Sequence, residues 1–171
     1  MKAGHLARRF LGSLRPGGPG PAAETWVGSL LNEGERALWC SMSGPDRRHA
    51  VAVARRVQRR LGDGAERAVL TAALLHDVGK VEAALGTLRR VVATLAAGRL
   101  RRLDRGHPAL RRPTLQRMAA YVRHDQLGAD LLRAAGSHPL AVTWAREHHL
   151  RPEAWTLPPH LAAALKAADD D

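Results

Sequence analysis

Apolar residues recur at helical spacing through most of the chain. Between Ser43 and Gly62, the residues His49, Val53 and Val57 follow at i, i+4 and i+8 and form one stripe, while the arginines of this stretch lie elsewhere on the helix. The stretch opens with Ser-Gly-Pro-Asp and closes with glycine, which are typical helix boundaries. It therefore predicts an amphipathic helix with His49 on its apolar side.

Further stretches show the same periodicity. They cover residues 23–42, with a possible break near residues 32–34, and residues 64–80, 81–98, 114–136, 138–152 and 158–171. We expect Gly79, Gly98 and Pro152 to end three of these helices, and residues 114–136 to form one broken helix or two. The β-branched runs that predict strands are scarce. The pattern predicts an all-α fold, a compact multi-helix bundle.

The length suits one domain with a substantial core. The chain has 171 residues, of which 45% are hydrophobic and only 4% aromatic, so alanine and leucine dominate the apolar set. Residues 1–21 are basic and end in RPGGPGP, which is typical of a linker. We therefore expect an N-terminal segment and linker at residues 1–21 and one domain at residues 22–171, with its functional motifs within residues 45–171.

The cysteine content and the absence of long apolar runs bear on the cellular location. Cys40 is the single cysteine, so no disulfide can form within the chain, which suits a reducing compartment. No apolar run approaches the roughly 20 residues of a membrane-spanning helix. The basic N-terminus lacks the apolar segment of a secretion signal. We expect a cytoplasmic protein without a membrane span.

The net charge of +11 permits two interpretations. It arises from 27 basic and 16 acidic residues, and such an excess is typical of proteins that bind nucleic acid or phosphorylated molecules. However, only Lys2, Lys80 and Lys166 are lysines, and the preference for arginine is also what a GC-rich gene produces. In a chain that uses arginine almost everywhere, lysine at position 80 indicates that a compact ammonium is required there.

Histidine and aspartate occur together at two predicted helix ends. The apolar run of LLHDVGK ends in His76 and Asp77, and the pair His148–His149 follows another predicted helix. Helix C-termini carry partial negative charge and favour a nearby cation. Imidazole and carboxylate without thiolate favour Mn, Fe, Co, Zn or Mg.

The candidate ligands are spread over most of the chain. They are His49, His76, Asp77, His124, His148, His149 and Asp169. Asp169 shares a helical stripe with Leu161 and Leu165, although Asp170 or Asp171 could serve instead. Because this set exceeds the needs of one ion with open positions, we expect two divalent metal ions held about 3.5–4 Å apart.

The ordered set resembles the HD-domain superfamily of metal-dependent phosphohydrolases. The order His, His-Asp, His, His-His, Asp is most similar to the branch that includes the HD-GYP phosphodiesterases, and LLHDVGK and RHDQLGADLL resemble the segments around two of its histidines. The chain has HHLRPEAWTLPP where that branch has its Gly-Tyr-Pro segment, which argues against cyclic dinucleotides as substrates. Pro45 stands where some members carry a glutamate, which argues against a third metal.

The resemblance implies a role for each candidate. One ion would be held by His49, His76, Asp77 and Asp169, and the other by His124, His148 and His149, with Asp77 between them. Lys80 would contact the substrate phosphate or an activated water. The implied reaction is hydrolysis of a phosphomonoester or phosphodiester, in a nucleotide or another small phosphorylated molecule, by a metal-activated hydroxide. Asp77 and Lys80 would then be the catalytic residues.

Two alternatives remain open. A metal-binding sensor or adaptor would keep these ligands without turnover. An arginine-rich helical protein would instead bind nucleic acid through the basic stretch that includes residues 99–112. The remaining histidines, His5, His107, His138 and His160, are expected to be structural.

Overall fold

The computed structural model of the protein describes residues 17–83, 92–100, 102–103 and 107–171, and every regular element in these ranges is a helix. The prediction of an all-α fold is therefore confirmed. The α-helices are α2 (Pro21–Leu30), α3 (Glu33–Ser41), α4 (Gly44–Leu61), α5 (Arg67–Leu75), α7 (Ala97–Leu100), α8 (Pro113–Val122), α9 (His124–Ala134), α10 (Pro139–Glu147) and α11 (Pro159–Asp170). Short 3₁₀ helices connect them: η1 (Gly62–Gly64), η2 (Val78–Ala83), η3 (Pro108–Arg111) and η4 (Pro152–Ala154).

Two predictions fall partly outside the described residues. The basic N-terminal segment lies mostly in residues 1–16, and the helix predicted over residues 81–98 includes residues 84–91. None of the described helices combines the length and apolar character needed to cross a membrane.

The amphipathic helix predicted between Ser43 and Gly62 is confirmed as α4. The hydroxyl of Ser43 accepts a hydrogen bond from the backbone N–H of Asp46 at 3.3 Å and so caps the first turn. Gly62 ends the helix with a φ of 53°, a conformation that favours glycine. Val53 and Val57 are buried in the core, as the stripe predicts.

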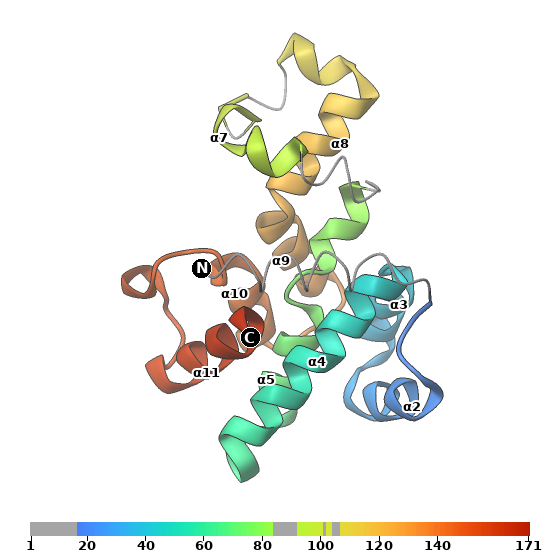
Figure 1. Ribbon diagram of the computed structural model, residues 1–171, viewed down its shortest axis with the longest axis vertical. Coiled ribbons are helices and arrows are strands. Elements are labelled where there is room, and N and C mark those ends of the chain that lie inside the picture. Colours follow the sequence, from blue (N-terminus) through green and yellow to red (C-terminus); the bar gives the residue numbers. More distant parts are fainter. Residues whose placement is uncertain (1–16, 84–91, 101, 104–106) are drawn as a thin grey trace.

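The main core surrounds α5. All residues of α5 from Val69 to Leu75 are buried, and α4 and α10 pack against this helix. α9 packs on α10 and η2, while α11 packs on α4, so the C-terminal helix lies beside the helix that carries His49 (Figure 1). Small core residues such as Ala72, Ala73 and Ala145 allow these helices to approach closely.

A second, smaller hydrophobic cluster lies in an arm that extends from this body (Figure 1). The arm contains α7, η3 and α8, and Met118 and Val122 of α8 belong to its core together with Ala93 and Leu100. The chain returns to the body where α8 ends and α9 begins, at Arg123. Residues 114–136 therefore form two helices, which was one of the two predicted arrangements.

Three predicted helix ends are wrong. Gly98 lies inside α7, in open space that would accept a side chain. Helix α10 ends at Glu147, where a turn closed by the Leu150 N–H and the Glu147 carbonyl at 2.8 Å replaces the helix before Pro152 is reached. Helix α5 ends at Leu75, and Gly79 lies within η2 instead.

Gly79 serves close backbone packing rather than helix termination. A Cβ atom at this position would lie 2.0 Å from the carbonyl oxygen of His124 and 2.6 Å from the backbone nitrogen of Gly128. Only glycine permits η2 and α9 to approach this closely. The contact joins the segment after Asp77 directly to the first turn of α9.

We expect Gly79→Ala to lower the free energy of unfolding by about 3 kcal/mol, because the new methyl group would meet backbone atoms that have no room to move aside. Urea denaturation followed by circular dichroism measures this loss. Gly28→Ala is the matched control, since a Cβ at Gly28 meets nothing within 4 Å; there we expect a gain of about 0.5–1 kcal/mol. Equal stabilities of the two variants would contradict the backbone contact.

Candidate metal centre

Helices distant in sequence bring a cluster of histidines and aspartates together. His76 and His148 occupy the C-caps of α5 and α10, each followed by a further candidate ligand, so the predicted location at helix ends is confirmed. The remaining candidates come from α4, α9 and α11. The cluster contains His49, His76, Asp77, His124, His148, His149 and Asp169.

The carboxylate of Asp77 lies at the centre of the cluster. Its Oδ1 lies 3.2 Å from Nε2 of His124 and 3.6 Å from Nε2 of His148. Its Oδ2 lies 3.4 Å from Nε2 of His76 and also pairs with the ammonium of Lys80. The two oxygens of one side chain therefore face different sets of histidines.

Two groups of possible ligands share Asp77. One contains Asp77, His124, His148 and His149, and the other contains His49, His76 and Asp77; within each group the ligand atoms lie within 4.8 Å of one another. Asp169 adjoins the second group, because its Oδ1 lies 3.0 Å from Nε2 of His49 and 3.7 Å from Nε2 of His76.

The histidine rings are oriented by their other nitrogens. Nδ1 of His76 lies 2.9 Å from the carbonyl oxygen of Ala73, Nδ1 of His124 lies 2.7 Å from that of Tyr121, and Nδ1 of His148 lies 2.9 Å from that of Ala145. A carbonyl only accepts, so each Nδ1 donates its hydrogen. In the neutral ring, Nε2 then presents a lone pair toward Asp77.

This arrangement leaves buried atoms that a cation would satisfy. Nε2 of His76, Nε2 of His148 and Oδ1 of Asp77 are buried and lack a hydrogen-bond partner among the residues that the structure describes. Buried polar atoms are normally paired, and lone pairs that face a carboxylate oxygen have no proton to share. Imidazole nitrogens and carboxylate oxygens around one point are the donor set of a divalent metal, so the residues present fit such an ion.

The charges of the cluster keep its carboxylates ionised. Burial opposes the charge on Asp77, but Lys80 and His76, with the nearby His124 and His148, hold its pKa well below the usual range. Burial also opposes the charge on Asp169, whose pKa is lowered by its hydrogen bond to His49 and by the nearby His76. Both side chains are thus carboxylates at neutral pH, as metal coordination requires.

The imidazoles respond to the same surroundings in opposite ways. Burial alone would lower the pKa of His76, but Asp77 and Asp169 outweigh it and raise that pKa. Burial lowers the pKa of His148. Desolvation together with the neighbouring His148 and His124 lowers the pKa of His149. His148 and His149 therefore favour the neutral form that can ligate a metal.

The last predicted ligand is held in place by two arginines of α4. Arg56 donates a hydrogen bond to the carbonyl oxygen of Ala168 at 3.1 Å, and Arg60 pairs with Asp171. Asp171 and Asp170 are about half exposed, with side-chain exposures of 54% and 52%, whereas Asp169 is buried against His49. The geometry thus favours Asp169 over its two neighbours.

The other candidates lie at the edge of the cluster or away from it. His149 is exposed, yet its Nε2 lies 3.0 Å from Nε2 of His124. His107 and His138 cap η3 and α10 through their Nδ1 atoms, while His160 is exposed. The two caps agree with structural roles for His107 and His138; His5 lies outside the described residues.

Some residues near the cluster were not identified from the sequence. Tyr121 stacks on His124 with ring centroids 5.7 Å apart, and Arg56 anchors the end of α11. Tyr121 is the only tyrosine of the chain and precedes His124 by one helical turn, which could have indicated its place. Arg56 carries no such signal, because its contact is 112 residues away in sequence.

Comparison with models of known protein families matches the HD domain at residues 48–170. This range contains all seven predicted ligands and Lys80. No curated protein and no solved structure matches the chain.

We expect Mn²⁺ to raise the melting temperature of metal-free protein, because an ion that binds only the folded cluster stabilises it by about 2.7 kcal/mol at a hundred times its Kd. Asp77→Asn should remove most of this shift, because it replaces the charged carboxylate shared by the two groups of possible ligands with a neutral amide. Asp130→Asn, which changes an exposed ion pair with Arg133, should retain the shift. Scanning fluorimetry measures all three; equal shifts in the two variants would place the ion elsewhere.

Arg56→Ala should weaken metal binding about tenfold, the lower limit of the effect that supporting residues have on metal affinity. The loss follows because Arg56 holds the end of α11 that presents Asp169. Arg59→Ala removes the same charge from an exposed position of α4 and should leave affinity unchanged. Titration calorimetry with Mn²⁺ provides the comparison, and a wild-type affinity in Arg56→Ala would show that Asp169 needs no such support.

Proposed function

Because the chain belongs to the HD-domain family, we propose that it is a metal-dependent phosphohydrolase that acts on a phosphomonoester or phosphodiester. The substrate would be a nucleotide or another small phosphorylated molecule. The observation that carries the proposal is the buried carboxylate of Asp77, whose Oδ1 faces Nε2 of His124 and His148 and whose Oδ2 faces Nε2 of His76.

We assign each group to one divalent ion. His49, His76, Asp77 and Asp169 would hold the first, and Asp77, His124, His148 and His149 the second. Imidazoles outnumber carboxylates in this set, which favours Mn, Fe, Co or Zn over Mg, an ion that prefers oxygen ligands. Such a pair, when bound, lowers the pKa of a water molecule and neutralises phosphate oxygens.

Lys80 would bind the substrate phosphate. Its side chain is only 15% exposed, and its pairing with Oδ2 of Asp77 directs the ammonium toward the cluster. Burial disfavours the charge, but Asp77 outweighs this effect and raises the pKa of Lys80, so the ammonium persists at neutral pH. A compact, permanently charged donor beside the ligands suits a phosphoryl oxygen that gains charge during hydrolysis.

The histidines would act mainly by geometry. The Nδ1 hydrogens of His76, His124 and His148 are committed to backbone carbonyls at helix ends, so these three rings are held in one orientation by the protein itself. The ions would therefore enter a largely preformed site. We also propose that residues 22–171 act as one domain, because Val27, Leu31 and Trp39 of the N-terminal helical region belong to the main core.

The hydrolysis of bis-p-nitrophenyl phosphate and p-nitrophenyl phosphate with Mn²⁺ or Fe²⁺ tests the function. We expect turnover by the wild type, loss of it in Asp77→Ala, and a fall in kcat of about 10²–10³-fold in Lys80→Ala with its metal content retained. Lys166→Ala is the control, because Lys166 pairs with the exposed Asp170. Metal bound without release of p-nitrophenol from either substrate would favour a sensor or adaptor instead.

Nucleic-acid binding is a second candidate, supported by the net charge of +11 and by exposed arginines on or near the arm: Arg99, Arg102, Arg111 and Arg112. It would give an affinity for RNA or DNA that falls steeply with salt and survives chelation of the metal. Fluorescence anisotropy with a labelled oligonucleotide at low salt measures this, and no binding there would exclude the function.

A further inference from the structure

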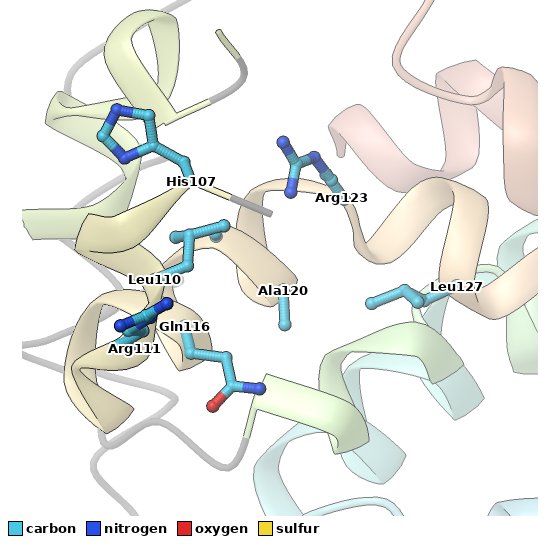
Figure 2. A pocket seen from close by; sticks show the side chains of 8 residues that line it. His107, Leu110, Arg111, Gln116, Ala120, Arg123 and Leu127 are labelled. Atoms are coloured by element: carbon cyan, nitrogen blue, oxygen red, sulfur yellow. The ribbon is translucent and has the colours of Figure 1, made fainter. Parts of the chain in front are cut away.

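A cavity of about 470 Å³ lies at the junction of η3, α8 and α9, and none of the candidate metal ligands lines it (Figure 2). Its polar side chains are those of His107, Arg111, Gln116 and Arg123, and its apolar wall includes Leu110 and Leu127. Among the described residues that line it, none is acidic. The volume is in the range of sites that bind small molecules.

The cavity follows from the arrangement of three elements. Gln116, Ala120, Arg123 and Leu127 succeed one another at helical intervals, so they share one side of the chain across the break between α8 and α9. Figure 2 shows Gln116 and Arg123 on opposite sides of Ala120, with Leu127 farther along α9. The turn of η3 adds His107 and Arg111 from the facing side.

The polar groups of the cavity are nearly all hydrogen-bond donors with capacity to spare. Nδ1 of His107 accepts a hydrogen bond from the backbone N–H of Ala109 at 3.1 Å, so in the neutral ring Nε2 carries the hydrogen. Arg123 donates a hydrogen bond to the carbonyl oxygen of Leu103. This bond uses one of the five N–H groups of the guanidinium. The side chains of Arg111 and Gln116 make no hydrogen bond within the described part of the chain.

We propose that this cavity is a binding site for a small anion that carries an apolar portion, such as an organic phosphate. Guanidinium groups match the oxygens of phosphate, phosphonate or carboxylate in pairs, while Leu110, Leu127 and the alanines would cover the apolar portion. The combination of two arginines with an apolar wall in one cavity distinguishes this site from a solvated basic surface.

The site adjoins the metal cluster through the chain itself. Arg123 directly precedes His124, and Ala120 directly precedes Tyr121, which stacks on His124. An anion held by Arg123 would thus rest against the segment that orients His124. Two sources of the same ligand chemistry are possible: a part of the phosphorylated substrate remote from the reacting phosphate, or a separate effector.

Phenylphosphonate is a suitable probe, because it joins an anion to an apolar ring and contains no phosphoester. Two-dimensional amide NMR of metal-loaded protein should show shifts at Ala120, Arg123 and Leu127 that saturate with probe concentration. Arg111→Ala should raise the Kd from these shifts about tenfold, as expected for the loss of one charged hydrogen bond. Gln116→Ala should raise it less, because its donor is uncharged.

Arg112→Ala is the matched control, since it removes the same charge from the neighbouring exposed residue, which does not line the cavity. Its Kd should stay within about twofold of the wild type, because an exposed charge that does not contact the ligand contributes little in water. Shifts confined to residues near Asp77 and His148, or equal weakening in the two arginine variants, would overturn the proposal. Inorganic phosphate binding as tightly as phenylphosphonate would overturn the apolar part of it.

The source of the ligand is distinguished by kinetics with bis-p-nitrophenyl phosphate. If phenylphosphonate raises KM without changing kcat, and Arg111→Ala weakens this effect, the cavity holds part of the substrate. If phenylphosphonate changes kcat, and Arg111→Ala again weakens this effect, the ligand is a separate effector. The NMR result stands without turnover, so failure of the proposed hydrolysis and failure of this site are separate outcomes.

Discussion

The candidate centre depends on one buried carboxylate surrounded by imidazoles whose hydrogens point away from it. Asp77 is 5% exposed, and its Oδ1 has no hydrogen-bond partner among the described residues. Burying a charge is costly unless an opposite charge is close. The ammonium of Lys80 supplies the opposite charge next to Oδ2, but Oδ1 faces only His124 and His148. A cation between these groups would complete the charge balance of the cluster.

The helices serve this cluster chiefly through their ends. His76 and His148 lie where α5 and α10 stop, and His124 lies where α9 starts, so nearby backbone carbonyls are available to accept from Nδ1. The same carbonyls add partial negative charge beside a cation. In the interior of a helix, these carbonyls would accept hydrogen bonds from backbone N–H groups of the same helix. This explains why the histidines of the predicted pairs occur at helix ends.

Local patterns predicted the helices and most of the cluster. The stripe of His49, Val53 and Val57 placed one histidine on a buried face, and the stripe of Leu161, Leu165 and Asp169 selected one of three terminal aspartates, in agreement with the burial of Asp169. Such patterns reflect interactions within a few residues, which the sequence displays directly.

Contacts between distant segments could not be predicted in this way. The sequence around Gly79 is typical of a helix end, yet Gly79 instead allows close packing against α9. Arg56 supports the cluster only because it contacts the end of α11. The cavity beside Arg123 likewise requires η3 to face α8, which no periodicity within either element indicates. Long-range packing decides these features, and it becomes visible only in three dimensions.

The contact of Gly79 with Gly128 has a consequence for how the cluster can open. Because no side chain separates η2 from α9, the segments that carry Asp77 and His124 are in direct backbone contact. Asp169 lies instead in the last turn of α11, where helix ends fray most readily. Transient loosening there would uncover the His49 side alone, so an ion held there as proposed would exchange with solvent more readily than one on the opposite side.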